Sequence, residues 1–123
     1  MHVNLPRDIL SNKENFMQFN KHKLDNHSAV KNEDIIKVIR LISNSLKPVI
    51  IVGAGIKNNG IYQDVVNLAK IIGSPIVSSA GHGDAIPANE ELYMGQMGPR
   101  GNILASRSVK ESDLILAIGT TLS

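Results

Sequence analysis

Three continuous runs of apolar residues, each closed by glycine or serine, constrain the fold of this chain more than any other feature. The runs are VIIVG (49–53), PIVSS (75–79) and DLILAIG (113–119). They lack the alternation of polar and apolar residues that marks a strand with one solvent-exposed face. Such runs are typical of strands buried on both faces, as in a parallel sheet that is covered by helices.

Helical periodicity between these runs predicts a three-layer α/β fold. Apolar residues recur at helical spacing over 33–46, 60–72 and 102–111, with Asn32 as the expected cap of the first helix and Gly73 as the end of the second. Because crossovers between parallel strands are right-handed, we expect a doubly wound, Rossmann-like sheet in which strands 49–53, 75–79 and 113–118 are parallel neighbours. Residues 81–101 are rich in glycine and proline and are expected to form a long loop with a turn of helix.

The N-terminal part of the chain has a different character. Residues 2–5 alternate weakly and meet Pro6, which predicts a short strand. Residues 11–32 are rich in Asn, Lys and His and are interpreted as a linker.

Composition excludes several functional classes. The 123 residues contain no cysteine, which rules out disulfide scaffolds, thiolate zinc sites and cysteine nucleophiles. Aromatic residues make up only 3%, so few side chains could stack on nucleic-acid bases, and a net charge of +2 is typical of a solvated surface. No apolar run is long enough to span a membrane and no signal peptide is visible, so we expect a cytoplasmic protein that binds neither nucleic acid nor membrane.

Each predicted strand ends in small or hydroxyl-bearing residues, and these are the candidate cofactor-binding residues. Ligands of open parallel sheets bind outside the carboxyl ends of the strands, where such residues let a phosphate approach backbone N–H groups. Tight strand-to-helix turns explain the same glycines equally well. The candidates at the strand ends and in the 81–101 segment are Gly53, Ala54, Gly55, Ser78, Ser79, Ala80, Gly81, Gly95, Met97, Gly98, Gly119, Thr120 and Thr121.

Familiar nucleotide and catalytic motifs are absent at this edge. GAGIKNNG (53–60) is not G-x-G-x-x-G, no acidic residue ends the second strand, and no P-loop is present. His82 is interpreted as a solvated loop residue and not as a general base. Arg100 and Arg107 either reach a phosphate or lie at the surface. No catalytic triad or metal-ligand set is found, so no residue is assigned a catalytic or metal-binding role.

Four segments in order resemble thiamine-diphosphate-dependent enzymes of the acetolactate synthase type. The segments are HVNLPRDIL (2–10), KPVIIVGAGI (47–56), PIVSSAGHGDAIPANEELYMGQMGPRGN (75–102) and DLILAIGTTLS (113–123). The first resembles the last strand of that family's pyrimidine-binding domain, and the others resemble its central domain. The resemblance implies that residues 1–10 end the first domain, 11–32 form a linker, and 33–123 form a central domain truncated at its C-terminal side.

The resemblance also implies the chemistry of a parent enzyme. That enzyme would decarboxylate a 2-keto acid such as pyruvate and transfer the two-carbon unit, as in branched-chain amino acid biosynthesis. Thiamine diphosphate and Mg²⁺ would be bound by the other domains across a homodimer interface, with FAD, ADP or no nucleotide in the central domain. The partners of this chain would be the remaining domains of the parent, in a homo-oligomer. Because the family's catalytic glutamate and its Gly-Asp-Gly segment are not in this sequence, we expect the fragment alone to be inactive, with a structural or nucleotide-binding role.

Two positions depart from the FAD-binding members of that family. Thr121 stands where they usually carry Arg, and Met97 stands where they usually carry His. These departures count against FAD as the nucleotide. A stand-alone nucleotide-binding or scaffold domain is a separate alternative. An NAD-dependent deacylase of the sirtuin type, whose Gly-Ala-Gly-Ile opening matches residues 53–56, is less favoured because the chain has no cysteine for its zinc site.

Overall fold

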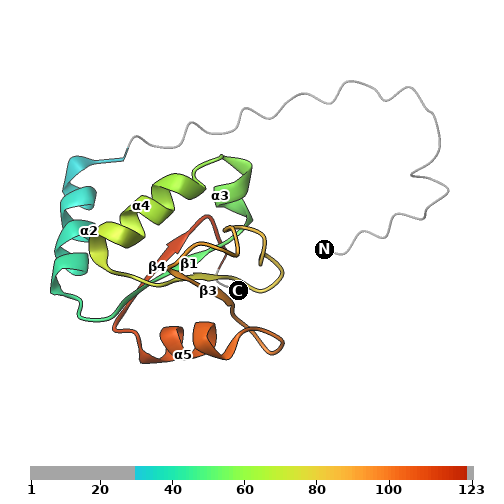
Figure 1. The fold of residues 1–123 in the computed structure, drawn as a ribbon. Coiled ribbons are helices and arrows are strands. Elements are labelled where there is room, and N and C mark those ends of the chain that lie inside the picture. The colour runs from blue at the N-terminus through green and yellow to red at the C-terminus, as the bar shows by residue number, and fades with distance from the viewer. Residues whose placement is uncertain (1–29, 122–123) are drawn as a thin grey trace, which may run out of the picture.

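Four parallel strands form one sheet in the computed structural model, which describes residues 30–121 apart from the side chain of Asn58 (Figure 1). In spatial order, the strands are β3 (Tyr93–Gln96), β2 (Ile76–Ser78), β1 (Pro48–Val52) and β4 (Leu114–Ile118). In the middle of β1, Ile50 is in register with Ile76 of β2 on one side and with Leu116 of β4 on the other. The prediction that the three apolar runs are parallel neighbours is confirmed.

Helices cover both faces of this sheet. α2 (Asn32–Asn44), α3 (Ala54–Asn58) and α4 (Tyr62–Ile72) lie on one side, and α5 (Ile103–Glu111) lies on the other (Figure 1). Along β1, Ile50 and Val52 belong to the core cluster that includes α4, whereas Val49 and Ile51 pack with Ala105 of α5. Because consecutive strand residues point to opposite faces, a strand between two helical layers must be apolar throughout. This is the three-layer, doubly wound arrangement that the sequence predicts.

The direction of winding reverses at β1. The chain leaves β1 through α3 and α4 to reach β2, whereas it reaches β4, on the opposite side of β1, through α5. In an open α/β sheet such a reversal leaves a crevice outside the carboxyl ends of the two strands. The topology therefore places a crevice between the turns that follow β1 and β4.

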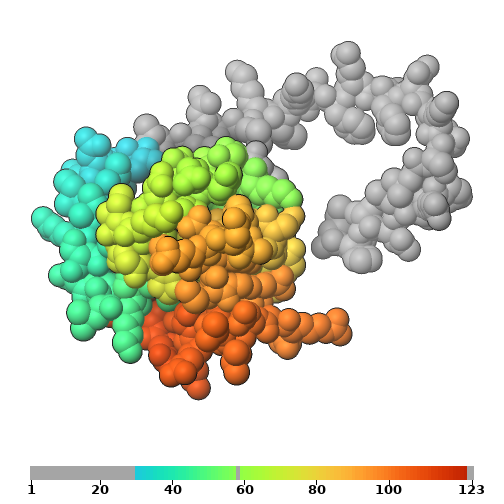
Figure 2. Space-filling view, in the orientation of Figure 1, coloured from blue at the N-terminus to red at the C-terminus, as the bar shows by residue number. Residues whose placement is uncertain are grey.

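Strand β3 differs from the sequence-based expectation. β3 lies within residues 81–101, which were expected to be a loop, and it pairs with β2 through an irregular register. Its four residues are only half-buried at the sheet edge, so they need no long apolar run. In Figure 2, the segment between β2 and α5 (gold to orange) covers the visible face between α4 and α5. It also buries Ala85 and Ile86 in the core.

Helix α2 is anchored at its end and not by its face. The expectation that its apolar residues cover the sheet is wrong, because none of them is buried and Ile35 and Ile39 are 45% and 55% exposed. The turn after α2 is held instead by Asp113, just before β4. The Asp113 carboxylate accepts hydrogen bonds from the backbone N–H groups of Leu46 and Lys47, at 2.8 and 3.0 Å.

The element ends agree with the sequence in part. Gly73 has a φ of 64° and ends α4, as predicted. Asn32 is the first residue of α2 and not its cap. The cap position is occupied by Lys31, whose side chain makes no capping hydrogen bond. α2 ends at Asn44, earlier than the predicted residue 46. The predicted strand 2–5, the first-domain segment 1–10 and residues 11–29 of the predicted linker lie outside the described residues.

Candidate functional site

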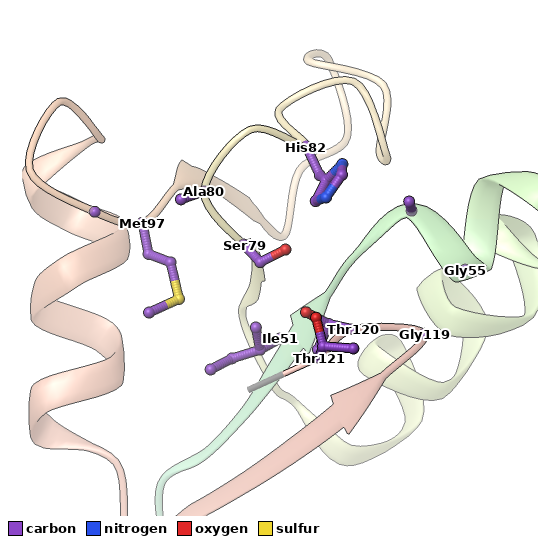
Figure 3. Close-up of a pocket in the computed structure, with 11 residues that line it drawn as sticks. Ile51, Gly55, Ser79, Ala80, His82, Met97, Gly119, Thr120 and Thr121 are labelled. Atoms are coloured by element: carbon purple, nitrogen blue, oxygen red, sulfur yellow. The ribbon is translucent and has the colours of Figure 1, made fainter. Parts of the chain in front are cut away.

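A groove of about 620 Å³ lies where four turns meet at the carboxyl ends of the strands (Figure 3). The turns follow β1, β2 and β4 and precede α5, so the groove occupies the crevice that the topology creates. Its volume is within the range of about 300–1,000 Å³ that is typical of small-molecule sites. The lining residues are Ile51, Ala54, Gly55, Ser79, Ala80, His82, Met97, Gly98, Gly119, Thr120 and Thr121.

The glycines at one end of the groove hold two turns together. The N–H of Gly55 donates a hydrogen bond of 2.8 Å to the carbonyl oxygen of Gly119, and the N–H of Gly53 donates one of 3.3 Å to Ile118. A Cβ on Gly55 would lie 2.7 Å from the Cα of Gly119, and a Cβ on Gly53 would lie 2.7 Å from its carbonyl oxygen. Close approach of the two backbones therefore requires glycine here. The N–H groups of Gly53 and Gly55, which the sequence suggests as donors to a phosphate, are therefore bonded within the protein.

The two serines at the end of β2, Ser78 in the strand and Ser79 after it, have separate roles. Ser78 is fully buried, and its hydroxyl lies 2.8 Å from the hydroxyl of Tyr93, which also donates a hydrogen bond of 3.1 Å to the carbonyl of Gly83. This bridge ties the loop after β2 to β3 and removes Ser78 from the groove. The N–H of Ser79 bonds to Val52 at 2.8 Å, and its side chain lies in the groove (Figure 3).

The turn before α5 supplies the apolar wall. The N–H of Met97 donates to the carbonyl of Ser78 at 2.9 Å, which fixes the start of the turn beside β2. The side chain of Met97 packs in the cluster of Ile51, and both line the groove (Figure 3). Gly95 faces elsewhere: a Cβ there would lie 2.9 Å from the Cβ of Asn102, so this glycine accommodates the cap of α5.

Most of the residues proposed from the sequence lie together around the groove, and some of them line it while others do not. Four of the proposed residues are outside the lining: Gly53, Ser78, Gly81 and Gly95. Gly53 and Gly95 instead allow close contacts with Gly119 and Asn102, and the hydroxyl of Ser78 is bonded to Tyr93. Two lining residues were not proposed as ligand-binding, Ile51 and His82. Nothing in the sequence marks Ile51 as a groove residue, because all of β1 is apolar. His82 could have been found, because it stands between two glycines in a loop that was already a candidate for the site. The residues proposed from the sequence that do line the groove are Ala54, Gly55, Ser79, Ala80, Met97, Gly98, Gly119, Thr120 and Thr121.

The groove is lined by hydroxyl groups and small or apolar side chains, with almost no charge. His82 is the single titratable residue in the lining. Close by, Lys57 of α3 forms an ion pair with Asp84, which links α3 to the loop that carries His82. The hydrogen bond from the Lys57 ammonium lowers the pKa of the Asp84 carboxyl below its ordinary value. Both side chains of this pair are more than half exposed, so it adds little to stability.

The side chains of Ser79 and His82 both line the groove. The side-chain hydrogen bonds of the described residues do not include one between the Ser79 hydroxyl and the His82 imidazole. Within residues 30–121, no three His, Asp or Glu side chains come together as a metal site would require. In the same part of the chain, none of the helices combines the length and apolar composition needed to cross a bilayer.

Comparison with protein families gives a match over most of the chain. The family described as "Thiamine pyrophosphate enzyme, central domain" matches residues 35–123. The matched region includes nearly all of α2, all four strands of the described sheet and every residue of the groove.

Similar curated proteins carry several enzyme names. Sulfoacetaldehyde acetyltransferase of Castellaniella defragrans is 35% identical over 68% of this chain and 14% of its own length. Acetolactate synthase of Mycobacterium leprae is 29% identical over 96% of this chain, and 3D-(3,5/4)-trihydroxycyclohexane-1,2-dione hydrolase of Clostridium perfringens is 27% identical over 98%. The chain spans only 19% of the length of each of these last two proteins.

Proposed function

Because this chain belongs to the thiamine pyrophosphate enzyme family, in which it matches the central domain, we propose that it is the central-domain part of an acetolactate-synthase-like enzyme. The proposed parent decarboxylates a 2-keto acid such as pyruvate and transfers the two-carbon unit to an acceptor. Thiamine diphosphate, when bound, supplies the electron sink for such chemistry. The relatives named as acetolactate synthase and as acetyltransferase support this reaction class.

In this proposal the described residues have no part in the thiamine chemistry. Within residues 30–121 no three His, Asp or Glu side chains come together, so these residues do not fit the Mg²⁺ that accompanies thiamine diphosphate. Both would be bound by other domains of a cytoplasmic homo-oligomer acting in branched-chain amino acid biosynthesis. The domain would instead position those parts, in keeping with its three-layer core.

We propose further that the groove holds the nucleoside part of FAD or ADP. The observation that carries this is the position of the groove at the reversal point of the sheet, where open α/β folds bind nucleotides. The hydroxyls of Ser79, Thr120 and Thr121 can donate to or accept from ribose and base edges. Ile51 and Met97 give a flat ring an apolar surface.

Titration calorimetry with FAD and with ADP tests this proposal on the 123-residue chain. We expect weak binding of at least one of them. Ala80→Trp places an indole in the groove and should abolish it, while Ala88→Trp, at an exposed loop position outside the groove, should not. Failure of both nucleotides to bind would leave the domain as a scaffold that joins the parts of its parent. Equal binding by the two variants would place the nucleotide outside the groove.

A further inference from the structure

We infer that Arg100 recognises the phosphate of a nucleotide held in the groove, an inference that rests on the proposed nucleotide binding. The base and ribose would lie among the hydroxyls of the groove. The phosphate would lie beside the turn that precedes α5, and not at the Gly-Ala-Gly turn after β1.

The groove by itself offers no fixed positive charge. None of the described residues that line it is Lys or Arg. Its hydroxyl groups suit neutral polar atoms, whereas a phosphate in a largely uncharged cleft needs a cation or several N–H donors. Recognition of the phosphate must therefore come from the border of the groove.

The border at the turn after β1 has two of its backbone donors and its cation already engaged. The N–H of Gly55 is bonded to Gly119 at 2.8 Å, and the N–H of Ile56 is bonded to Gly53 at 3.3 Å. The only cation of α3, Lys57, already forms an ion pair with Asp84. A phosphate that used Gly55, Ile56 or Lys57 would have to displace these partners.

The opposite border opens into a second hollow of about 280 Å³. A turn fixes its rim, because the N–H of Gly101 donates to the carbonyl of Gly98 at 2.9 Å. The hollow shares Ala80, Met97 and Gly98 with the groove and adds Gln96, Pro99 and Arg100. A nucleotide whose base and ribose lie in the groove can thus extend its phosphate along this turn to Arg100.

The charge of Arg100 is available for such a ligand. Its side chain is exposed, and the ion pairs among the described residues involve other cations, Lys37, Lys57, Lys70 and Arg107. A guanidinium presents two parallel N–H donors that match the oxygens of a phosphate, which an ammonium cannot do.

Calorimetric titration of the full chain with ADP and with adenosine tests the inference. We expect Arg100→Ala to weaken ADP binding about tenfold and to leave adenosine binding unchanged, because one charge-assisted contact is lost. Arg100→Lys should restore only part of the ADP affinity. Lys57→Ala, which removes the cation at the other border, and Arg107→Ala, on the exposed face of α5, should bind ADP like the wild type.

The outcomes separate this inference from the proposal beneath it. If ADP binds and Arg100→Ala binds it equally well, or if Lys57→Ala is the variant that loses affinity, Arg100 is not the phosphate residue while the nucleotide groove stands. If neither ADP nor adenosine binds the wild-type chain, the inference fails together with the proposed nucleotide binding. Circular dichroism of each variant should match the wild type, since all three positions are exposed.

Discussion

Replacing Gly55 by alanine asks whether this glycine serves the fold or the groove. Local propensity favours the change, because Gly55 lies in α3 and alanine is about 1 kcal/mol better than glycine inside a helix. Packing opposes it, because the new Cβ would lie 2.7 Å from the Cα of Gly119 and 2.9 Å from its carbonyl oxygen. Both contacts are with backbone, which cannot rotate aside as a side chain can. The turns after β1 and β4 would have to separate.

The opposing effects can be compared in free energy. Overpacking in a close contact costs about 1–3 kcal/mol. Weakening the hydrogen bond from Gly55 to Gly119, now 2.8 Å, adds about 1 kcal/mol. After the propensity gain of about 1 kcal/mol is subtracted, we expect Gly55→Ala to lower the free energy of unfolding by about 2 kcal/mol.

Urea unfolding followed by circular dichroism measures this difference, with Gly83→Ala as the matched control. A Cβ on Gly83 would meet only the end of the flexible Gln96 side chain, at 3.0 Å, so the control should change stability by less than about 0.5 kcal/mol. A Gly55→Ala protein as stable as the wild type, or more stable, would refute the argument. The glycine would then be free of any packing requirement, as a purely ligand-facing position would be.

Three further changes have defined outcomes. The Asp113 pKa is lowered by hydrogen bonds from the Ser45 hydroxyl and the Leu46 N–H. Its stabilising effect is therefore complete above the unfolded-state pKa and is lost as pH falls through the lower folded value. Melting temperatures taken from neutral pH to below 3.8 should thus fall less steeply in Asp113→Asn, and parallel curves would contradict this. Tyr93→Phe should cost about 1–2 kcal/mol because buried Ser78 loses its partner, and adding Ser78→Ala should cost little more; full additivity in urea unfolding would exclude the bridge. Thiamine diphosphate with Mg²⁺ should neither raise the melting temperature of this chain nor support pyruvate turnover; an upward shift would show a thiamine site in it.

The site could be located from the sequence but not resolved residue by residue. Small and hydroxyl-bearing residues after three buried strands must lie at one edge of a parallel sheet, so the groove was expected there. Local pattern does not distinguish Ser78 from Ser79, because both stand at the end of the same apolar run. Their roles diverge only because Tyr93, from the β3 strand that the pattern did not reveal, reaches Ser78 and fixes it in the core.

The apolar runs are enough to predict the layered fold, because continuous apolar strands can be buried only between two helical layers. The small and hydroxyl-bearing residues at their ends predict the edge of the sheet at which the groove lies. Contacts between distant turns depend on how the strands are ordered in space. The reversal of winding at β1 places β4 beside it, which brings Gly119 against Gly55 and Asp113 against the end of α2. Such neighbours follow from the spatial order of the strands and not from residue spacing along the chain. The groove that lies between these turns is lined almost entirely by uncharged residues, and Arg100 lines the hollow beside it.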